Sequence, residues 1–156
     1  MLDAMKVLIG TDGSEAALDA ARRALPLLAP ADTVVVVCVV EAPSIAAEGF
    51  ESGFAGGVAA PEEIDSAWAA ANEAARGALA ATVAVLDTSA TVEQLAETGD
   101  IGPTMCAVAQ EQSCDILVVG SRGHGAIRRA LLGSVSTHLV NHAPCPVMVV
   151  REGAGD

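Results

Sequence analysis

Short apolar stretches alternate with amphipathic ones along the whole chain. Val34 to Val40 is an unbroken apolar run, which is typical of a strand covered on both faces in a parallel sheet. From Ser14 to about Leu28 the apolar residues recur at the helical period, although Pro26 should kink or end that helix early. The full pattern predicts strands at 5–10, 33–40, 91–97, 116–119 and 146–150, and helices at 14–28, 61–86, 101–112 and 134–142.

Strand–helix alternation of this kind predicts an α/β fold, a three-layer, doubly wound sandwich with right-handed crossovers. In such sheets ligands bind beyond the carboxyl ends of the strands, where the strand order reverses. The 156 residues, 52% of them hydrophobic, fit one compact domain spanning 1–156. The stretch 42–60 is rich in glycine, alanine and serine, and we predict a flexible loop there.

Two of the predicted strands end in glycine-rich turns. The first strand runs into Gly10–Ser14, and the fourth runs into Gly120–Gly123, with Gly133 and Ser134 at the start of the next helix. Glycines let backbone N–H groups approach an anion closely, and a helix beginning at Ser134 presents its unpaired first-turn donors to the same anion. If these strands are neighbours, Asp12 and the glycines face one crevice that suits a phosphate.

The charge distribution points to the same region. The chain carries a net charge of −12, yet the segment 116–151 contains no Asp or Glu and holds Arg122, Arg128, Arg129 and Arg151. A basic region around the glycines favours an anionic ligand, although arginines near helix ends also serve the helix dipole. The acidity of the remaining chain disfavours general nucleic-acid binding.

The sequence also limits where the protein acts. Its apolar stretches are too short to cross a bilayer, and the first residues do not resemble a signal peptide, so we expect no membrane association and a cytoplasmic location. The cysteines at 38, 106, 114 and 145 form no Cys-x-x-Cys pair. We therefore expect reduced, mostly buried thiols rather than disulfides or a zinc site.

The glycine motif resembles that of the universal stress protein family. Gly120, Gly123, Gly133 and Ser134 match Gly-x2-Gly-x9-Gly-Ser, and the turn from Asp12 matches Asp-Gly-Ser-x-x-Ala. The resemblance covers nearly the whole chain. It implies a five-stranded parallel sheet of order 3-2-1-4-5 with the adenine nucleotide alpha hydrolase-like fold, and a homodimer formed through the last strand, Pro146 to Val150.

Members with the glycine motif bind ATP, so the resemblance implies an ATP-binding regulatory module in the stress response, with ADP or AMP as other possible ligands. Asp12 would approach the nucleoside beside Thr11, and Mg²⁺ bound to the nucleotide could meet Asp12. The backbone of Val39 would read the adenine. The remaining implied contacts are Val119 on the base side and, for the ribose and phosphates, Gly120, Arg122, Gly123, Gly133, Ser134, Val135 and Ser136. One departure from the family pattern is Gly10, where a proline is common.

Several side chains have a second interpretation. Asp12 could accept a hydrogen bond from a ribose hydroxyl, hold a metal-bound water, or cap the following helix. Ser134 could cap the final helix and still leave N–H groups for phosphate. His138 and His142 have the spacing of a zinc-binding pair without an evident third ligand, and two polar residues near a helix C-terminus are the alternative. His124, beside the glycines, could touch phosphate or be an exposed loop residue.

Two other functions stay open at this point. The chain could be a dimeric scaffold of the same fold that binds no nucleotide. It could also be a slow ATP hydrolase, at most a weak ATPase, because no Glu, Lys or His is clearly placed to activate water.

Overall fold

A computed structural model describes residues 4–28, 30–43, 59–123 and 132–152. Its five strands form one parallel sheet in the order β3-β2-β1-β4-β5. The predicted fold class and strand order are therefore confirmed. The strands are β1 (Lys6–Gly10), β2 (Thr33–Val40), β3 (Thr91–Thr98), β4 (Ile116–Gly120) and β5 (Val147–Val150).

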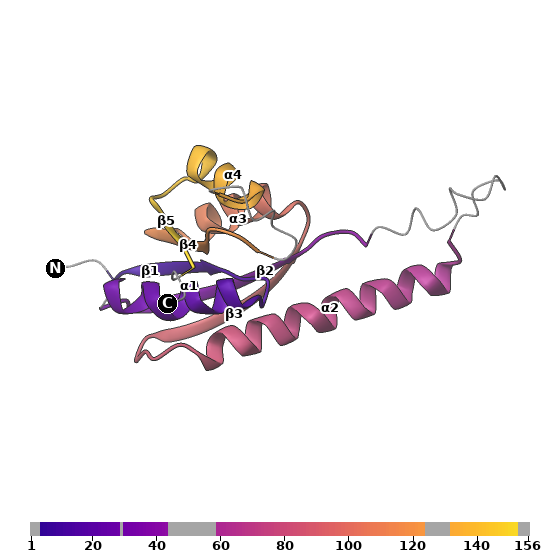
Figure 1. Ribbon diagram of the computed structural model, residues 1–156, viewed down its shortest axis with the longest axis horizontal. Coiled ribbons are helices and arrows are strands. Elements are labelled where there is room, and N and C mark those ends of the chain that lie inside the picture. Colours follow the sequence, from indigo (N-terminus) through magenta and orange to yellow (C-terminus); the bar gives the residue numbers. More distant parts are fainter. Residues whose placement is uncertain (1–3, 29, 44–58, 124–131, 153–156) are drawn as a thin grey trace.

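Helices cover both faces of this sheet (Figure 1). One face packs against α1 (Glu15–Ala24) and α2 (Pro61–Ala84), and the other against α3 (Ile101–Glu111) and α4 (Ser134–His142). In the described part of the chain, no helix is both long and apolar enough to span a membrane.

The element boundaries follow local chemistry. After α1 the chain tightens into the 3-10 turn Leu25–Leu28, as expected from Pro26, which has no N–H for the helical ladder. Pro61 opens α2 at a first-turn position, and the Glu63 carboxylate accepts a hydrogen bond from the Ala60 N–H at 3.1 Å. The predicted loop 42–60 lies outside the described residues except at its ends, 42–43 and 59–60.

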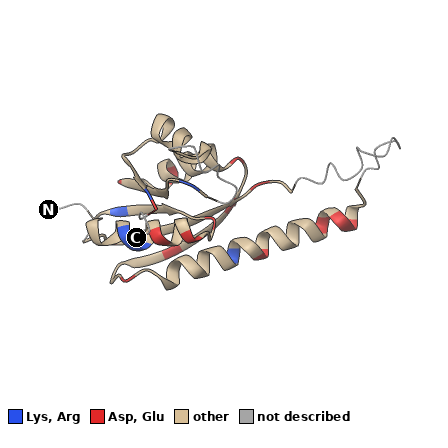
Figure 2. Ribbon diagram, in the orientation of Figure 1, with Lys and Arg blue, Asp and Glu red and all other residues tan. Residues whose placement is uncertain are grey.

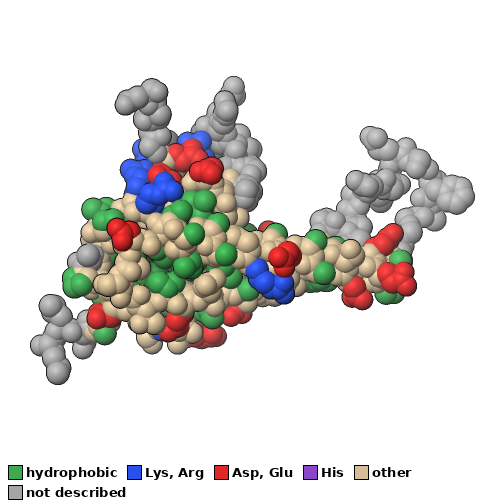
Figure 3. All heavy atoms as spheres, turned by 90° about the horizontal axis from the view of Figure 1, so that it is seen from below, with side chains coloured by type: hydrophobic (Ala, Val, Ile, Leu, Met, Phe, Trp, Pro, Cys, Tyr) green, Lys and Arg blue, Asp and Glu red, His purple; other side chains and the backbone are tan. Residues whose placement is uncertain are grey.

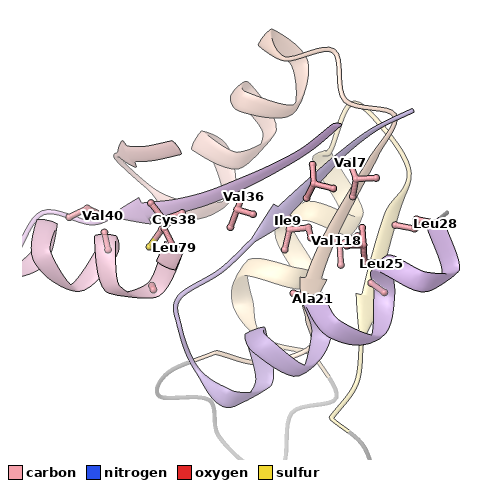
Figure 4. Packing of buried hydrophobic residues seen from close by; sticks show 14 residues of the cluster. Val7, Ile9, Ala21, Leu25, Leu28, Val36, Cys38, Val40, Leu79 and Val118 are labelled. Atoms are coloured by element: carbon pink, nitrogen blue, oxygen red, sulfur yellow. The ribbon is translucent and has the colours of Figure 1, made fainter. Parts of the chain in front are cut away.

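The sheet splits the core into two clusters, and β2 contributes side chains to both. Val34, Val36 and Cys38 point toward α1 and α2, whereas Val35 and Val37 point toward α3 and α4. This double burial is the reason that β2 reads as an unbroken apolar run. Figure 4 shows the first cluster, in which Val7, Ile9, Val36 and Val118 lie close to Ala21, Leu25 and Leu79.

The first half of α2 projects beyond the sheet (Figure 1). Acidic residues mark its tip (Figure 2), with Glu62 and Glu63 in the first turn. From the α2 side, hydrophobic side chains gather over the body of the molecule, and the projecting end shows acidic ones (Figure 3). The part of α2 that is buried lies in its second half, at Ala75, Ala78, Leu79 and Thr82.

The strand order reverses at β1, which lies between β2 and β4. The last register pair with β2 joins Gly10 to Val37, and the last with β4 joins Ile9 to Val118. The chain leaves β1 at Thr11, whose N–H donates to the Val37 carbonyl at 2.9 Å. The carboxyl end of β1 is thus the place where a ligand crevice is expected in a doubly wound sheet.

Candidate functional site

A cavity of about 460 Å³ opens at this place. It lies over the carboxyl ends of β1, β2 and β4 and beside the first turn of α4. The residues proposed from the sequence come from separate parts of the chain, and all of them line this one cavity. They are Thr11, Asp12, Val39, Val119, Gly120, Arg122, Gly123, Gly133, Ser134, Val135 and Ser136.

The Asp12 carboxylate lies between the two glycine-rich turns. Its Oδ1 accepts a hydrogen bond from the Ser14 N–H at 2.9 Å. Its Oδ2 lies so close to Gly123 that a Cβ at that glycine would overlap it. The prediction that Asp12 faces the glycines across one crevice is confirmed.

Asp12 does not cap α1, so that interpretation was wrong. The N-cap is Ser14, whose hydroxyl oxygen accepts a hydrogen bond from the Ala17 N–H at 3.2 Å. Two residues before the N-cap, Asp12 instead closes the turn, and its Oδ2 faces Gly123 in the β4 turn.

The Thr11 side chain is used to hold this turn in place. Its hydroxyl is 2.7 Å from the buried hydroxyl of Thr82 on α2 and accepts a hydrogen bond from the Gly13 N–H at 3.1 Å. Gly13 has a φ of +76°, which favours glycine, and a Cβ there would lie 2.9 Å from that of Ala78. Thr11 therefore lines the cavity while its hydroxyl is engaged elsewhere.

We call Gly120, Gly123, Gly133 and the first turn of α4 (Ser134–Ser136) the glycine cradle. Gly133 is the N-cap of α4 and forms no side-chain cap hydrogen bond, so the prediction that Ser134 caps the helix was wrong. A helix start of this kind leaves its first backbone N–H groups available to a ligand and gives it the positive end of the helix dipole.

The Ser136 hydroxyl faces into the protein. It donates toward the carbonyl oxygens of Gly133, at 3.1 Å, and Ser121, at 3.2 Å, and the residue is 2% exposed. The Gly133 N–H also donates to the Ser121 carbonyl, at 2.8 Å. These bonds fasten the start of α4 to the end of β4, so the two parts of the cradle are held in one geometry.

Arg122 adds a positive charge beside the cradle. The residue is half-buried and lines the cavity. Its Nε is buried and has no hydrogen-bond partner among the described residues. A buried donor on a cationic side chain suits an anionic oxygen, so the donor set of the cradle fits a phosphate group.

Apolar side chains also line the cavity. We call Val37, Val39, Met105 and Val119 its apolar lining. The last register pair of β1 and β2 joins Gly10 to Val37. Every second residue of a strand directs its backbone N–H and carbonyl groups to the same side, so those of Val39 point toward β1's side of β2, beyond the last residue of β1. The Val39 N–H and carbonyl groups can therefore meet the polar edge of a ligand that rests on the apolar side chains.

Several residues that line the cavity were not predicted from the sequence. Glu41, Asp100, Ile101, Met105 and His138 all line the cavity. The signal for Asp100 and Ile101 was their position directly after β3, at the same sheet edge as the other turns. His138 is four residues after Ser134 and hence on the same helix face, which is the signal that could have found it.

His138 packs on the first turn of α3. A Cβ at Gly102 would lie 2.6 Å from its Cδ2, and its ring stacks on that of His142 with centroids 4.4 Å apart. The described residues contain no group of three or more His, Cys, Asp or Glu side chains able to hold a metal ion. The zinc interpretation of this pair therefore finds no support, while His124 lies outside the described residues.

The four cysteines are free thiols, and Cys38 and Cys114 are buried. Burial raises the pKa of the Cys38 thiol, and the Asp12 carboxylate raises it further. Burial likewise raises the pKa of the other three thiols. Of the thiols expected to be mostly buried, Cys38 and Cys114 are buried, and Cys106 and Cys145 are half-buried.

Known proteins share this architecture. A family model described as the universal stress protein family matches residues 4–151. The Universal stress protein A-like protein of Arabidopsis thaliana is 40% identical over 60 residues, which are 38% of this chain and 34% of that protein. The match thus spans only about a third of the length of that curated relative.

Two solved structures align over almost their whole length. A universal stress protein in complex with cAMP is 25% identical, with a TM-score of 0.59, and the alignment covers 94% of this chain and 96% of that one. A universal stress protein family protein from Arabidopsis thaliana with AMP bound is 18% identical, with a TM-score of 0.63 and coverage of 96% and 93%. At 18% identity, the likeness to the AMP-bound structure shows that the two proteins share a fold.

Proposed function

The chain belongs to the universal stress protein family, and from this premise we propose that it binds an adenine nucleotide in the cavity at the strand ends. In this proposal the protein is a regulatory module of the stress response that responds to nucleotide, and ATP, ADP and AMP are its candidate ligands. The relatives solved with cAMP and with AMP support the adenine nucleoside as the common part of the ligand.

The observation that carries this proposal is that one cavity combines apolar side chains with the backbone donors of the glycine cradle. The base rests on the valines and Met105, with its polar edge on the Val39 backbone. The ribose lies over the end of β1, where a hydroxyl donates to Asp12. The phosphates take the N–H groups of the glycine cradle and the Arg122 side chain.

Magnesium enters the proposal only with the nucleotide. Asp12 is the carboxylate nearest the cradle, so a Mg²⁺ bound to the phosphates would meet it directly or through a water. When bound, the ion neutralises phosphate charge. Binding of ATP should then weaken when Mg²⁺ is removed with EDTA, whereas binding of AMP should change little.

The proposal includes a homodimer and a cytoplasmic location. β5 is an edge strand of the sheet with half-buried valines and a methionine. An apolar edge strand invites pairing with a second copy in antiparallel fashion.

The test begins with the protein as it comes from the cell. Purified protein is denatured, and the released small molecules are identified by mass spectrometry, while stripped protein is titrated with AMP, ADP and ATP by calorimetry. We expect an adenine nucleotide with affinity in the micromolar range. Absence of any released nucleotide together with no heat of binding would favour the scaffold of the same fold.

Hydrolysis is measured on the same samples. We expect conversion of ATP to be slow, because a regulatory module must hold its ligand long enough to be read. A turnover approaching ~10 s⁻¹, which is the median for dedicated enzymes, would replace the regulatory proposal with the hydrolase.

A further inference from the structure

Gly10 and Met105 are in direct contact beneath the cavity. Gly10 ends β1, and Met105 lies in the second turn of α3 and is 3% exposed. A Cβ built at Gly10 would overlap Met105 Cε and would lie 3.1 Å from both Met105 Sδ and Val119 Cγ1. The thioether thus occupies the space that a side chain at position 10 would fill.

This contact is part of the cavity wall beside the apolar lining, and we call it the floor of the cavity. Both residues line the cavity, and the register partner of Gly10 is Val37, two residues before Val39. The ligand face of this floor is the end of the Met105 side chain, because Gly10 contributes only backbone. The thioether of Met105 therefore limits how deeply a ligand can bind over the end of β1.

We propose that Met105, seated on Gly10, is a specificity-determining residue that sets the size of the base accepted by the site. The proposal rests on the proposed function, because it requires the base to lie against the apolar lining. A thioether is flexible and makes favourable contacts with aromatic rings, so it suits a purine surface. The glycine at position 10 is what lets this long side chain lie flat against the sheet end.

The pair is tested by a double-mutant cycle of Gly10→Ala and Met105→Ala, with AMP affinity measured by calorimetry. Gly10→Ala should weaken binding by about tenfold or more, because the new methyl group pushes the thioether into the cavity. Adding Met105→Ala to this variant should recover most of the loss. Gly77→Ala is the matched control, since nothing lies within 4 Å of a Cβ at Gly77.

A second measurement needs no change at Gly10. Wild-type protein and Met105→Ala are titrated with AMP analogues that carry a benzyl group on the base. The wild type should reject these analogues, and the enlarged floor of Met105→Ala should bind at least one of them while still binding AMP. This result distinguishes a size limit from a general loss of packing, which would weaken every ligand.

The outcomes separate the two proposals. Wild-type protein that binds no adenine nucleotide overturns the proposed function and this inference together. Wild-type protein that binds AMP, but shows equal affinity in Gly10→Ala or strictly additive losses in the cycle, overturns the inference alone. Rejection of every benzyl analogue by a folded Met105→Ala also overturns it, and thermal melts show whether each variant is folded.

Discussion

Gly123 and Gly133, which line the same cavity as Asp12, are not equivalent. A Cβ at Gly123 would overlap the Asp12 carboxylate, whereas a Cβ at Gly133 would make only ordinary contacts, the nearest at 3.4 Å from the Ser121 carbonyl oxygen. Both residues lie outside helices and strands. Steric consequences for the site should therefore be larger at Gly123.

We predict that Gly123→Val weakens AMP and ATP binding by about tenfold or more, because the side chain displaces Asp12 and fills the cavity entrance. The melting temperature should stay near that of the wild type, since Gly123 is exposed. Calorimetric titration measures the effect, with Gly77→Val as the control. Unchanged affinity in Gly123→Val would show that the nucleotide does not pass between Asp12 and the cradle.

Cys38 offers a test of the electrostatics below the site. Its pKa is raised by burial and by the Asp12 carboxylate. The fraction of reactive thiolate is therefore small at neutral pH and increases only as the pH rises. We expect slow labelling by a thiol reagent near pH 7 and faster labelling at alkaline pH, followed at Cys38 by mass spectrometry. Asp12→Asn removes the negative charge and should speed labelling at a given pH. Equal rates in both proteins would contradict the proximity of these two groups.

At the scale of elements, the start of each helix depends on different chemistry. Ser14 caps α1 with its side chain, while α4 begins at Gly133 with no side-chain cap. Ser14→Ala should lower the free energy of unfolding by about 1 kcal/mol. Ser134→Ala should change it by no more than a few tenths of a kcal/mol, the range of ordinary surface substitutions.

Urea denaturation of both variants measures this difference. A loss in Ser134→Ala as large as that in Ser14→Ala would mean that the Ser134 hydroxyl caps α4 after all. The Ser134→Ala variant also tests ligand binding, because a Ser134 side chain that does not cap the helix is available to phosphate. Nucleotide affinity of Ser134→Ala should then fall while its stability does not.

The elements that could be predicted from the sequence are those in which burial alone determines the order of apolar and polar residues. β2 reads as a continuous apolar run because helices cover both of its faces, and the turns at Asp12 and Gly123 follow directly from the ends of β1 and β4. The cradle was found for the same reason, since its glycines stand at a spacing that the topology brings to one sheet edge.

The parts that escaped prediction depend on how helices rotate against the sheet. Whether His138 faces the cavity or solvent is decided by the packing of α4 on α3, with the ring lying on Gly102. The contact of Met105 with Gly10 joins residues 95 positions apart and cannot be read from local periodicity. The cap of α4 was misplaced because a serine after a glycine satisfies the capping pattern at either position.

At the scale of the whole molecule, β5 is the strand on which the proposed dimer depends. Its residues are half-buried in the single chain, and Val149 packs beside the α3/α4 cluster. If two copies pair through this edge, Val149→Lys places like charges close together, and light scattering should find a monomer where the wild type is a dimer. Leu27→Lys is the control, since Leu27 is 75% exposed.

Thermal melts accompany this measurement, because a lysine at position 149 also enters a partly apolar environment. A wild-type protein that is monomeric at micromolar concentration would overturn the proposed dimer. A dimer that persists in a folded Val149→Lys would place the interface elsewhere.

The bond between Thr11 and Thr82 has a mechanical consequence. It fastens the turn that carries Asp12 to a point near the end of α2, and from there the helix runs without interruption to Pro61. At 1.5 Å per residue, that length is about 30 Å. Ala75, Ala78 and Leu79, close to Thr82 on the same helix, are buried in the core, so the Asp12 turn is tied to the anchored half of α2 and not to its acidic tip.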